Sequence, residues 1–295
     1  MTETQEPRSL RWLIREPHES EFPAFRMLLP DVAANTSGRV LRLAVDSAKP
    51  SIAGALAYSD DSQSVTNVRL HVVKTCRRQG VGSALLNYAV DEARRLGRTR
   101  VFADADMRKE PDAEAFLAAR SFRRVGQLTT VRGALAGRGP KAALFQKYLA
   151  KAQQFPPGSR IVRMSEAPAG QIKALFKDYI ANVPLLEEAH RNLRPERHRG
   201  LAVMVGDRVI SFILTSVQGN CAHVPALVVV PEYRGRGLTF RMMEVLAQRA
   251  DPAVTHVQFE FTESAAYTAK MAAEFGYEIL RVAVRFQGDI ENGPA

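Results

Sequence analysis

Apolar positions along the first half of the chain predict a fixed series of strands and helices. Alternating or continuous apolar residues predict four strands, and these lie at 38–47, 51–60, 64–73 and 99–107. Between the third and fourth strands, apolar residues recur at helical spacing from 81 to 93, which predicts an amphipathic helix. A helix at 112–122 and a closing strand complete the series.

The same series returns in the second half. Its predicted strands lie at 200–207, 208–217, 221–230 and 255–263, and its last helix at 265–277. A helical stretch precedes each meander, at 18–34 and at 168–190. The element order is therefore β-α-β-β-β-α-β-α-β, twice, which predicts an α/β (α+β) fold in duplicate.

The two series align at a single offset. Gly80 corresponds to Gly237, 237 − 80 = 157 residues later, and at that offset Leu70 falls on Leu227. This period is much longer than that of a solenoid repeat. We therefore expect two domains, at 1–135 and 160–295, joined by a linker at 136–159 that contains a short amphipathic helix.

Composition and charge limit the class of protein. With 46% hydrophobic and 24% charged residues, the 295-residue chain resembles soluble globular proteins. No apolar run approaches the ~20 residues needed to span a bilayer, and the start, MTETQEPRSLRW, lacks a signal-peptide core. Two cysteines are too few for a disulfide framework or a cysteine-based zinc site, and no metal-ligand spacing is present, so we expect a cytoplasmic protein. A net charge of +10 favours an anionic partner: nucleic acid, acidic lipid or a phosphate-rich small molecule.

Two glycine-rich turns, RRQGVGS at 77–83 and RGRGLT at 234–239, open the helix in each half. A helix N-terminus presents unpaired N–H groups and a partial positive charge, and glycine lets an anion approach the backbone. Arginines in both turns add donors, so a diphosphate fits. Neither turn has the Gly-Lys-Ser/Thr of a Walker A loop or the third glycine of a dinucleotide fingerprint. A lone G-x-G is weak evidence, and a tight turn remains the alternative.

These residues resemble a known family. A strand ending in L-x-V, followed by R-x-x-G-x-G/A at a helix start, is similar to the acyl-CoA signature of the GNAT N-acetyltransferase superfamily. VVVPEYRGRGL is close to that family's common wording, and Gly276-Tyr277 and Ser121-Phe122 resemble its Gly-Phe before the last strand. The resemblance implies two tandem GNAT domains, each with a mixed, mostly antiparallel sheet flanked by helices.

The resemblance also implies where acetyl-CoA binds. Backbone N–H groups of the turns would hold its pyrophosphate, and the preceding strand would pair with pantetheine; the second copy departs from the pattern by ending in Thr239. The residues implied are Val72, Val73, Arg77, Arg78, Gln79, Gly80, Val81, Gly82 and Ser83 in the first copy, and Val229, Val230, Arg234, Gly235, Arg236, Gly237, Leu238 and Thr239 in the second.

The family transfers acetyl directly to an amine with the help of a general base, and an acid then reprotonates the thiolate. The tyrosine that many relatives carry five residues before the aromatic is replaced by Leu117 and Ala272. The substitute acids are Tyr267 and, less favoured, Tyr88. The candidate bases, which could equally form a solvated strand face, are Asp104 with Asp106, Glu260 and Glu263.

Other chemistry-bearing residues have ordinary structural interpretations. Glu232, His71 and His223 lie on or beside strands, where packed or surface roles are commoner than catalysis. An arginine run at 191–199 could clamp an anion, and Glu187 with Glu188 could meet a cationic amine, but both patterns are usual in solvated segments.

The sequence favours an N-acetyltransferase that acts on a primary amine of a small molecule, with catalysis in the second half and acyl-CoA bound in the first half or in both. An inactive acyl-CoA-binding module and, less favoured, a basic nucleic-acid-associated protein are the alternatives. The arginine run lacks interleaved aromatic residues, which disfavours nucleic acid as a partner. The lack of a long apolar run disfavours a membrane.

Overall fold

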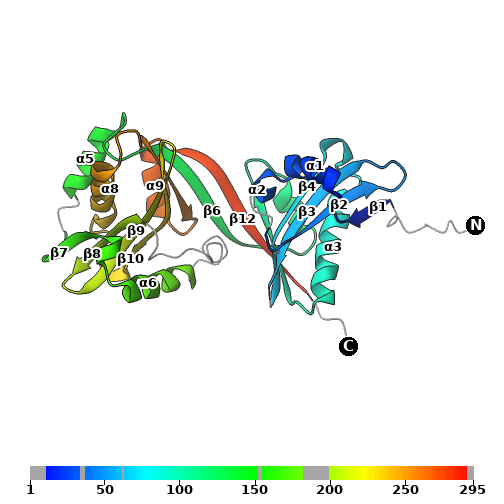
Figure 1. Cartoon of the computed structure of the whole chain (residues 1–295), viewed down its shortest axis with the longest axis horizontal. Helices are drawn as coiled ribbons and strands as arrows, with labels where there is room; N and C mark the ends of the chain where they lie inside the picture. The colour runs from blue at the N-terminus through cyan, green and yellow to red at the C-terminus, as the bar shows by residue number, and fades with distance from the viewer. Residues whose placement is uncertain (1–10, 34–36, 62, 152–154, 182–198, 291–295) are drawn as a thin grey trace, which may run out of the picture. The chain divides into compact units, whose positions relative to one another are not determined.

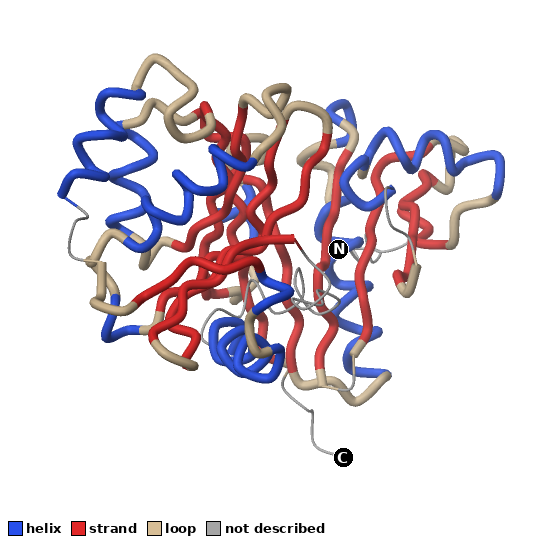
Figure 2. The backbone as a smooth tube through the Cα atoms, turned by 60° about the vertical axis from the view of Figure 1, so that its left-hand side comes forward, coloured by secondary structure: helices blue, strands red, loops and turns tan. Residues whose placement is uncertain are grey.

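The computed structural model describes residues 11–33, 37–61, 63–151, 155–181 and 199–290. The chain forms two compact units: unit 1 comprises Met1–Val125 and Val284–Ala295, and unit 2 comprises Gly126–Ala283. In both units, helices pack against strands, and short loops connect the helices and strands (Figure 2). The element order β-α-β-β-β-α-β-α-β occurs twice, which confirms the predicted fold class.

Unit 1 contains a sheet in the order β1-β2-β3-β4-β5-β12, and helices α1 and α3 pack against this sheet (Figure 1). Its elements are β1 (Trp12–Arg15), α1 (Phe22–Leu28), α2 (Pro30–Ala33), β2 (Arg39–Asp46), β3 (Ile52–Asp60), β4 (Ser64–Val72), α3 (Val81–Arg95), β5 (Arg100–Asp106) and α4 (Ala113–Ala118), with the end of β12 (Glu278–Asp289). Helix α3 buries the apolar face that its spacing predicts, including Leu85, Leu86 and Ala89.

Unit 2 has the sheet order β6-β11-β10-β9-β8-β7. Its elements are β6 (Arg123–Ala134), α5 (Ala142–Lys151), β7 (Ser159–Arg163), α6 (Ala169–Ala181), β8 (Arg199–Val205), β9 (Arg208–Gln218), β10 (Cys221–Val229), α8 (Leu238–Arg249), β11 (His256–Thr262) and α9 (Ala266–Glu274). Helix α5 forms inside the segment predicted as a linker and packs on α8, with Phe145 buried in the unit 2 core.

The two units exchange their closing strands. Strand β6, the last strand of the first half, pairs with β11 from Leu128 opposite Thr262 to Ala134 opposite His256. Strand β12, the last of the second half, lies next to β5 and belongs to unit 1 from Val284 onward. The units therefore differ from the predicted division at 1–135 and 160–295, which kept each closing strand with its own half.

The exchanged closing strands make a matched contact in the two units. A Cβ on Gly133 of β6 would lie 2.0 Å from the ring of Tyr277, and a Cβ on Gly288 of β12 would lie 2.7 Å from the ring of Phe122. Both closing strands thus offer a glycine to the aromatic residue that follows the last helix. Because each aromatic packs across the glycine of the other half's strand, the exchange keeps the contact in both units.

The unit 2 sheet is covered on both faces. One buried cluster joins its strands to α5 and α8 through residues such as Phe145, Phe240 and Met242. The other joins them to α6 through Ile172 and Phe176. These clusters define an α8 face and an α6 face of the sheet, which are used below.

Candidate functional site

Both glycine-rich turns have the same backbone geometry. In unit 1, Arg78 and Gly80 have φ of +60° and +87°; in unit 2, Gly235 and Gly237 have φ of +76° and +75°. Two left-handed residues spaced two apart turn successive N–H groups toward one point, which is the geometry of an anion-binding nest. A non-glycine residue in this region is strained by about 1–2 kcal/mol, and unit 1 keeps the turn despite that cost at Arg78.

The turns fit a diphosphate. Gly80 and Gly237 are helix N-caps with no side-chain hydrogen bond. The first helical bonds run from Ala84 N–H to the Gly80 carbonyl at 2.9 Å and from Arg241 N–H to the Gly237 carbonyl at 3.1 Å. The N–H groups at 81–83 and 238–240 precede those bonds, so they face the helix N-terminus, where an anion is stabilised.

An arginine in each turn bonds to the strand before it. Arg77 Nε donates to the Val72 carbonyl at 3.4 Å, and Arg234 Nε donates to the Val229 carbonyl at 3.2 Å. These bonds fix the guanidinium beside the turn. The predicted cofactor residues at 77–83 and 234–239 are therefore brought together in each unit, around the N-termini of α3 and α8.

The central strands of each unit separate along their length. Strands β10 and β11 pair in parallel only over Cys221–Val224 and His256–Phe259, and β4 and β5 over Ser64–Val68 and Arg100–Ala103, within the described residues. A register shift in β10 between His223 and Ala226 accompanies the separation. Beyond it, the edge of β10 toward β11 is free of strand pairing, so an extended chain with amide groups could pair there.

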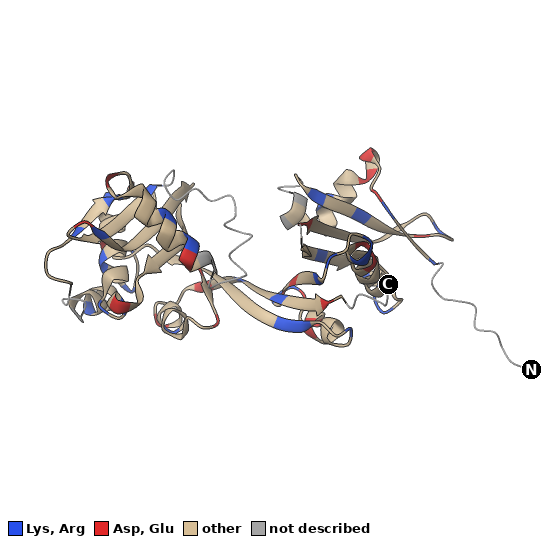
Figure 3. Ribbon diagram, turned by 90° about the horizontal axis from the view of Figure 1, so that it is seen from below, with Lys and Arg blue, Asp and Glu red and all other residues tan. Residues whose placement is uncertain are grey.

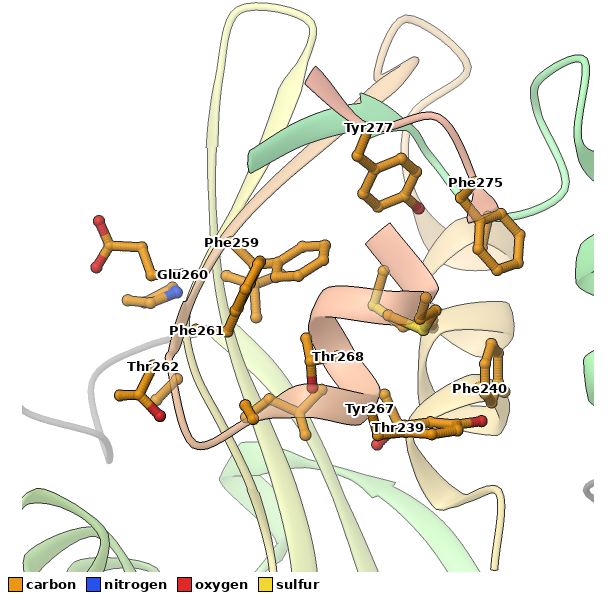
Figure 4. Close-up of a pocket in the computed structure, with 18 of the residues that line it drawn as sticks. Thr239, Phe240, Phe259, Glu260, Phe261, Thr262, Tyr267, Thr268, Phe275 and Tyr277 are labelled. Atoms are coloured by element: carbon orange, nitrogen blue, oxygen red, sulfur yellow. The ribbon is translucent and has the colours of Figure 1, made fainter. Parts of the chain in front are cut away.

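The separation in unit 2 opens into a cavity of about 230 Å³. Its walls come from β10, β11, α8 and α9, with Tyr179 of α6 and Phe145 of α5 (Figure 4). Phe259 lies on the α8 face, whereas Glu260 and Thr262 point to the opposite side of β11. The cavity therefore passes through the sheet and connects its two faces.

Glu260 lies at the α6 end of this cavity. Its Oε1 accepts a 3.0 Å hydrogen bond from Thr130 Oγ1 on β6. Tyr179 also lines the cavity, and burial together with the charge of Glu260 raises the pKa of Tyr179 to about 12. Glu260 and Tyr179 thus both lie beside the opening.

Tyr179 is a residue that the sequence reasoning missed. The signal is the spacing of Ile172, Phe176 and Tyr179 on one helical face, where Tyr179 alone carries a hydroxyl.

The other two predicted catalytic residues of unit 2 are placed differently. Tyr267 lines the cavity on the α8 side, beside Thr239 and Phe240, and is 63% exposed (Figure 4). Glu263 is exposed and is not among the lining residues. Ala272, at the position of the family's tyrosine, is buried.

Asp104 of unit 1 is the counterpart of Glu260. The strand register pairs Ser64 with Arg100 and Cys221 with His256, and Asp104 and Glu260 each lie four residues further on. Both oxygens of Asp104 accept from Arg285, at 2.7 Å from Nε and 2.8 Å from Nη2. The two side chains are only 10% and 8% exposed. This buried ion pair occupies Asp104 with holding β12, a role that the sequence reasoning did not foresee.

Unit 1 also fills the space that is open in unit 2. A Cβ on Gly82 would lie 3.3 Å from the Phe116 ring, and Arg120 stacks on that ring at 3.9 Å and donates to Ser83 Oγ. Counted back from the aligned aromatics Phe122 and Tyr277 (277 − 122 = 155), Phe116 and Arg120 correspond to Met271 and Phe275. Those two residues line the unit 2 cavity.

Three of the remaining candidates, Tyr88, Glu232 and Asp106, have side-chain partners. Tyr88 accepts a 2.7 Å bond from Arg42 Nε, and Glu232 pairs with Arg208 at 3.3 Å. Asp106 is buried and pairs with Lys109 at 3.9 Å. His71 is partly buried, which lowers its pKa, and His223 is likewise partly buried on β10. Of the arginine run only Arg199 is described, as the exposed first residue of β8; the rest of that run, with Glu187 and Glu188, lies outside the described residues.

Basic residues are spread over the elements of both units among the acidic ones (Figure 3).

A helix of sufficient length and apolarity to cross a membrane is not found in the part of the chain that the structure describes.

A duplicated α/β unit with an anion-binding turn at a helix N-terminus, beside two separating parallel strands, defines the class of acyl-CoA-dependent acyltransferases. The model of the Acetyltransferase (GNAT) family matches residues 7–122 and 169–277, so the chain belongs to that family. It has the tandem architecture, with one family region in each half. No curated protein matches the sequence.

Solved structures show the same fold. A GCN5-related N-acetyltransferase from Sphaerobacter thermophilus is 15% identical, with a TM-score of 0.65 over 97% of this chain and 98% of its own. A tandem GNAT protein from the clavulanic acid biosynthesis pathway is 20% identical, with a TM-score of 0.56 over 88% of this chain and 85% of its own. The glucosamine N-acetyltransferase region of a fungal multi-domain β-N-acetylglucosaminidase is 15% identical, with a TM-score of 0.66 over 94% of this chain and 38% of its own.

Proposed function

We propose that the protein transfers an acetyl group from acetyl-CoA to a primary amine of a small molecule, and that unit 2 carries the reaction. The observation that supports this most directly is the cavity through the unit 2 sheet. It joins the α8 side, where the turn at 234–239 begins the helix, to the α6 side, where Glu260 and Tyr179 lie.

The residues divide into two groups along this path. The N–H groups at the start of α8 and the guanidinium of Arg234 bind the pyrophosphate, and the free edge of β10 pairs with the amides of the pantetheine arm. Acetyl-CoA supplies an acyl group activated as a thioester. Glu260 and Tyr179 face the acceptor from the other side of the sheet.

Glu260 acts as the general base. A protonated amine has no lone pair, so the carboxylate, held by Thr130, takes its proton directly or through water. The neutral amine nitrogen then bonds to the acyl carbon and loses its second proton to water, the carbon–sulfur bond breaks, and the thiolate leaves with its electron pair and is reprotonated. Tyr267 is the candidate donor of that proton because it lines the α8 side of the cavity. The Tyr179 hydroxyl donates to Glu260 or to the acceptor.

Unit 1 serves as a scaffold in this proposal. Arg285 neutralises the counterpart of Glu260, and Phe116 with Arg120 fills the space between α3 and α4. A second candidate is an acyl-CoA-binding module without turnover. It is supported by the Asp104–Arg285 ion pair and the filled space in unit 1, and by the replacement of the family's tyrosine with Leu117 and Ala272. Glu260 at the unit 2 opening favours the enzyme.

Release of free CoA thiol from acetyl-CoA with a panel of small amines tests the proposal, together with Gly237→Val and Gly80→Val. A β-branched side chain is strained at the positive φ of either turn. We expect Gly237→Val to abolish turnover and acetyl-CoA binding, and Gly80→Val to retain turnover. Gly206→Val is the matched control, since Gly206 also has positive φ (+55°) in unit 2, with open space around it.

Acetyl-CoA binding without turnover across the panel would favour the binding module. Turnover that survives Gly237→Val and is lost in Gly80→Val would move the reaction to unit 1. An absence of acetyl-CoA binding in the wild type would overturn the proposal.

A further inference from the structure

The cavity of unit 2 extends beyond the opening where the thioester must react. On the α8 face, its lining continues away from Glu260 toward Phe275 and Tyr277 (Figure 4). We call this region the apolar pocket; its residues are Ala136, Phe145, Met243, Met271, Phe275 and Tyr277. Phe145 comes from α5, a helix outside the repeated β-α-β-β-β-α-β-α-β series.

The chemistry of the apolar pocket differs from that of the pantetheine path. A pantetheine arm carries two amides, which need hydrogen-bonding partners when they leave water. The free edge of β10 offers such partners. The apolar pocket offers aliphatic and aromatic side chains and one hydroxyl, and the Tyr277 hydroxyl already donates to the Ala134 carbonyl at 3.3 Å. An apolar chain therefore suits this pocket, whereas the amide-bearing arm does not.

The volume also exceeds what an acetyl group needs. An acetyl methyl fills about the space of one water molecule, whereas a dry apolar cavity of about 150 Å³ holds a six-carbon ring. The whole cavity, from its α6 end to the apolar pocket, measures about 230 Å³. Two flexible methionines, Met243 and Met271, line the apolar pocket and can adjust its walls to the chain that enters.

We propose that unit 2 accepts acyl-CoA donors with an unbranched acyl chain of about six carbons, whose tail occupies the apolar pocket. This inference rests on the proposed function, because it assigns the donor of the same reaction. The bond changes are those given above: the amine nitrogen bonds to the acyl carbon and the thiolate leaves. The longer chain adds only burial of methylene groups.

The test is calorimetric titration of the full chain with CoA, acetyl-CoA, butyryl-CoA and hexanoyl-CoA. Burial of each methylene strengthens hydrophobic binding by about fourfold. We therefore expect affinity to rise from acetyl-CoA to hexanoyl-CoA by well over tenfold. CoA and acetyl-CoA should bind with similar affinity. Equal affinity for acetyl-CoA and hexanoyl-CoA, or weaker binding of the latter, would overturn the inference and leave the proposed function intact. Failure to bind acetyl-CoA would instead remove the proposed function.

Two variants locate the acyl tail. Met271→Phe and Ala136→Leu add volume to the apolar pocket, so both should remove the advantage of hexanoyl-CoA. Met27→Phe is the matched control because Met27 is 83% exposed in unit 1. Thermal melting of each variant checks that it folds. If both filled variants fold and still bind hexanoyl-CoA more tightly than acetyl-CoA, the tail lies elsewhere and the assignment of the pocket is wrong.

Discussion

The equivalent carboxylates Glu260 and Asp104 allow one sharp test of which unit reacts. We expect Glu260→Gln and Asp104→Asn to have opposite effects on turnover and stability. Glu260→Gln keeps an oxygen that can accept from Thr130, so the unit should stay folded, with a stability change within about 0.5 kcal/mol. It removes the base, however, which lowers kcat by about 10²–10⁴-fold.

Asp104→Asn should leave kcat unchanged and destabilise unit 1. The substitution removes the charge opposite Arg285, and both side chains are at most 10% exposed. Breaking a buried ion pair by removing one partner costs about 3–5 kcal/mol. For a unit of this size, a loss of 3 kcal/mol lowers the melting temperature by about 6–12 °C.

The assay measures thiol release with an acceptor found in the amine panel, at 20 °C, alongside calorimetric melting of both variants. If Asp104→Asn loses turnover while its melting is unchanged, Asp104 is a reacting group and unit 1 is not a scaffold. If Glu260→Gln keeps wild-type kcat, Glu260 is not the base.

Three further outcomes follow from other contacts. Gly133→Ala and Gly288→Ala should each lose about 1–3 kcal/mol in thermal melting, because the added methyl meets the ring of Tyr277 or Phe122, whereas Gly170→Ala, which has open space around it, should be neutral or stabilising. Tyr179→Phe should lower kcat/KM by about tenfold through loss of one hydrogen bond. The pH profile of kcat/KM between pH 6 and 9 should not change, because a phenol whose pKa is raised to about 12 stays protonated below that value. A shift of that pH profile in the variant would contradict this. Phe116→Ala combined with Arg120→Ala should open the space between α3 and α4 and raise the stoichiometry of acetyl-CoA binding from one to two by calorimetry, and an unchanged stoichiometry would show that other groups close unit 1.

Local patterns were sufficient to predict the elements and the turns. Continuous apolar residues over 208–217, alternation over 221–230 and helical spacing over 81–93 all reflect burial, and β9, β10 and α3 form there. The turn geometry is likewise local, since positive φ at Gly80 and Gly237 is a property of glycine next to a helix start.

The exchange of closing strands could not be predicted in the same way. Both closing strands carry a glycine at the matching position, so the sequence pattern at Gly133 and Gly288 does not say which aromatic each will meet. The different hydrogen-bond partners of Asp104 and Glu260 depend on this exchange. Arg285 of β12 bonds to Asp104, and Thr130 of β6 bonds to Glu260. Tyr179 approaches from a helix about eighty residues away in sequence, which only the fold reveals.

The exchange also sets an order for biosynthesis. A ribosome synthesises residues 126–283 of unit 2 before it makes Val284–Asp289, the part of β12 that unit 1 needs beside β5. The half that is translated first is therefore completed last, and until then the edge of β5 lacks its neighbouring strand. A frameshift that alters Val284–Asp289 would for that reason damage the amino-terminal unit, far from it in sequence, while sparing the unit that holds the cavity.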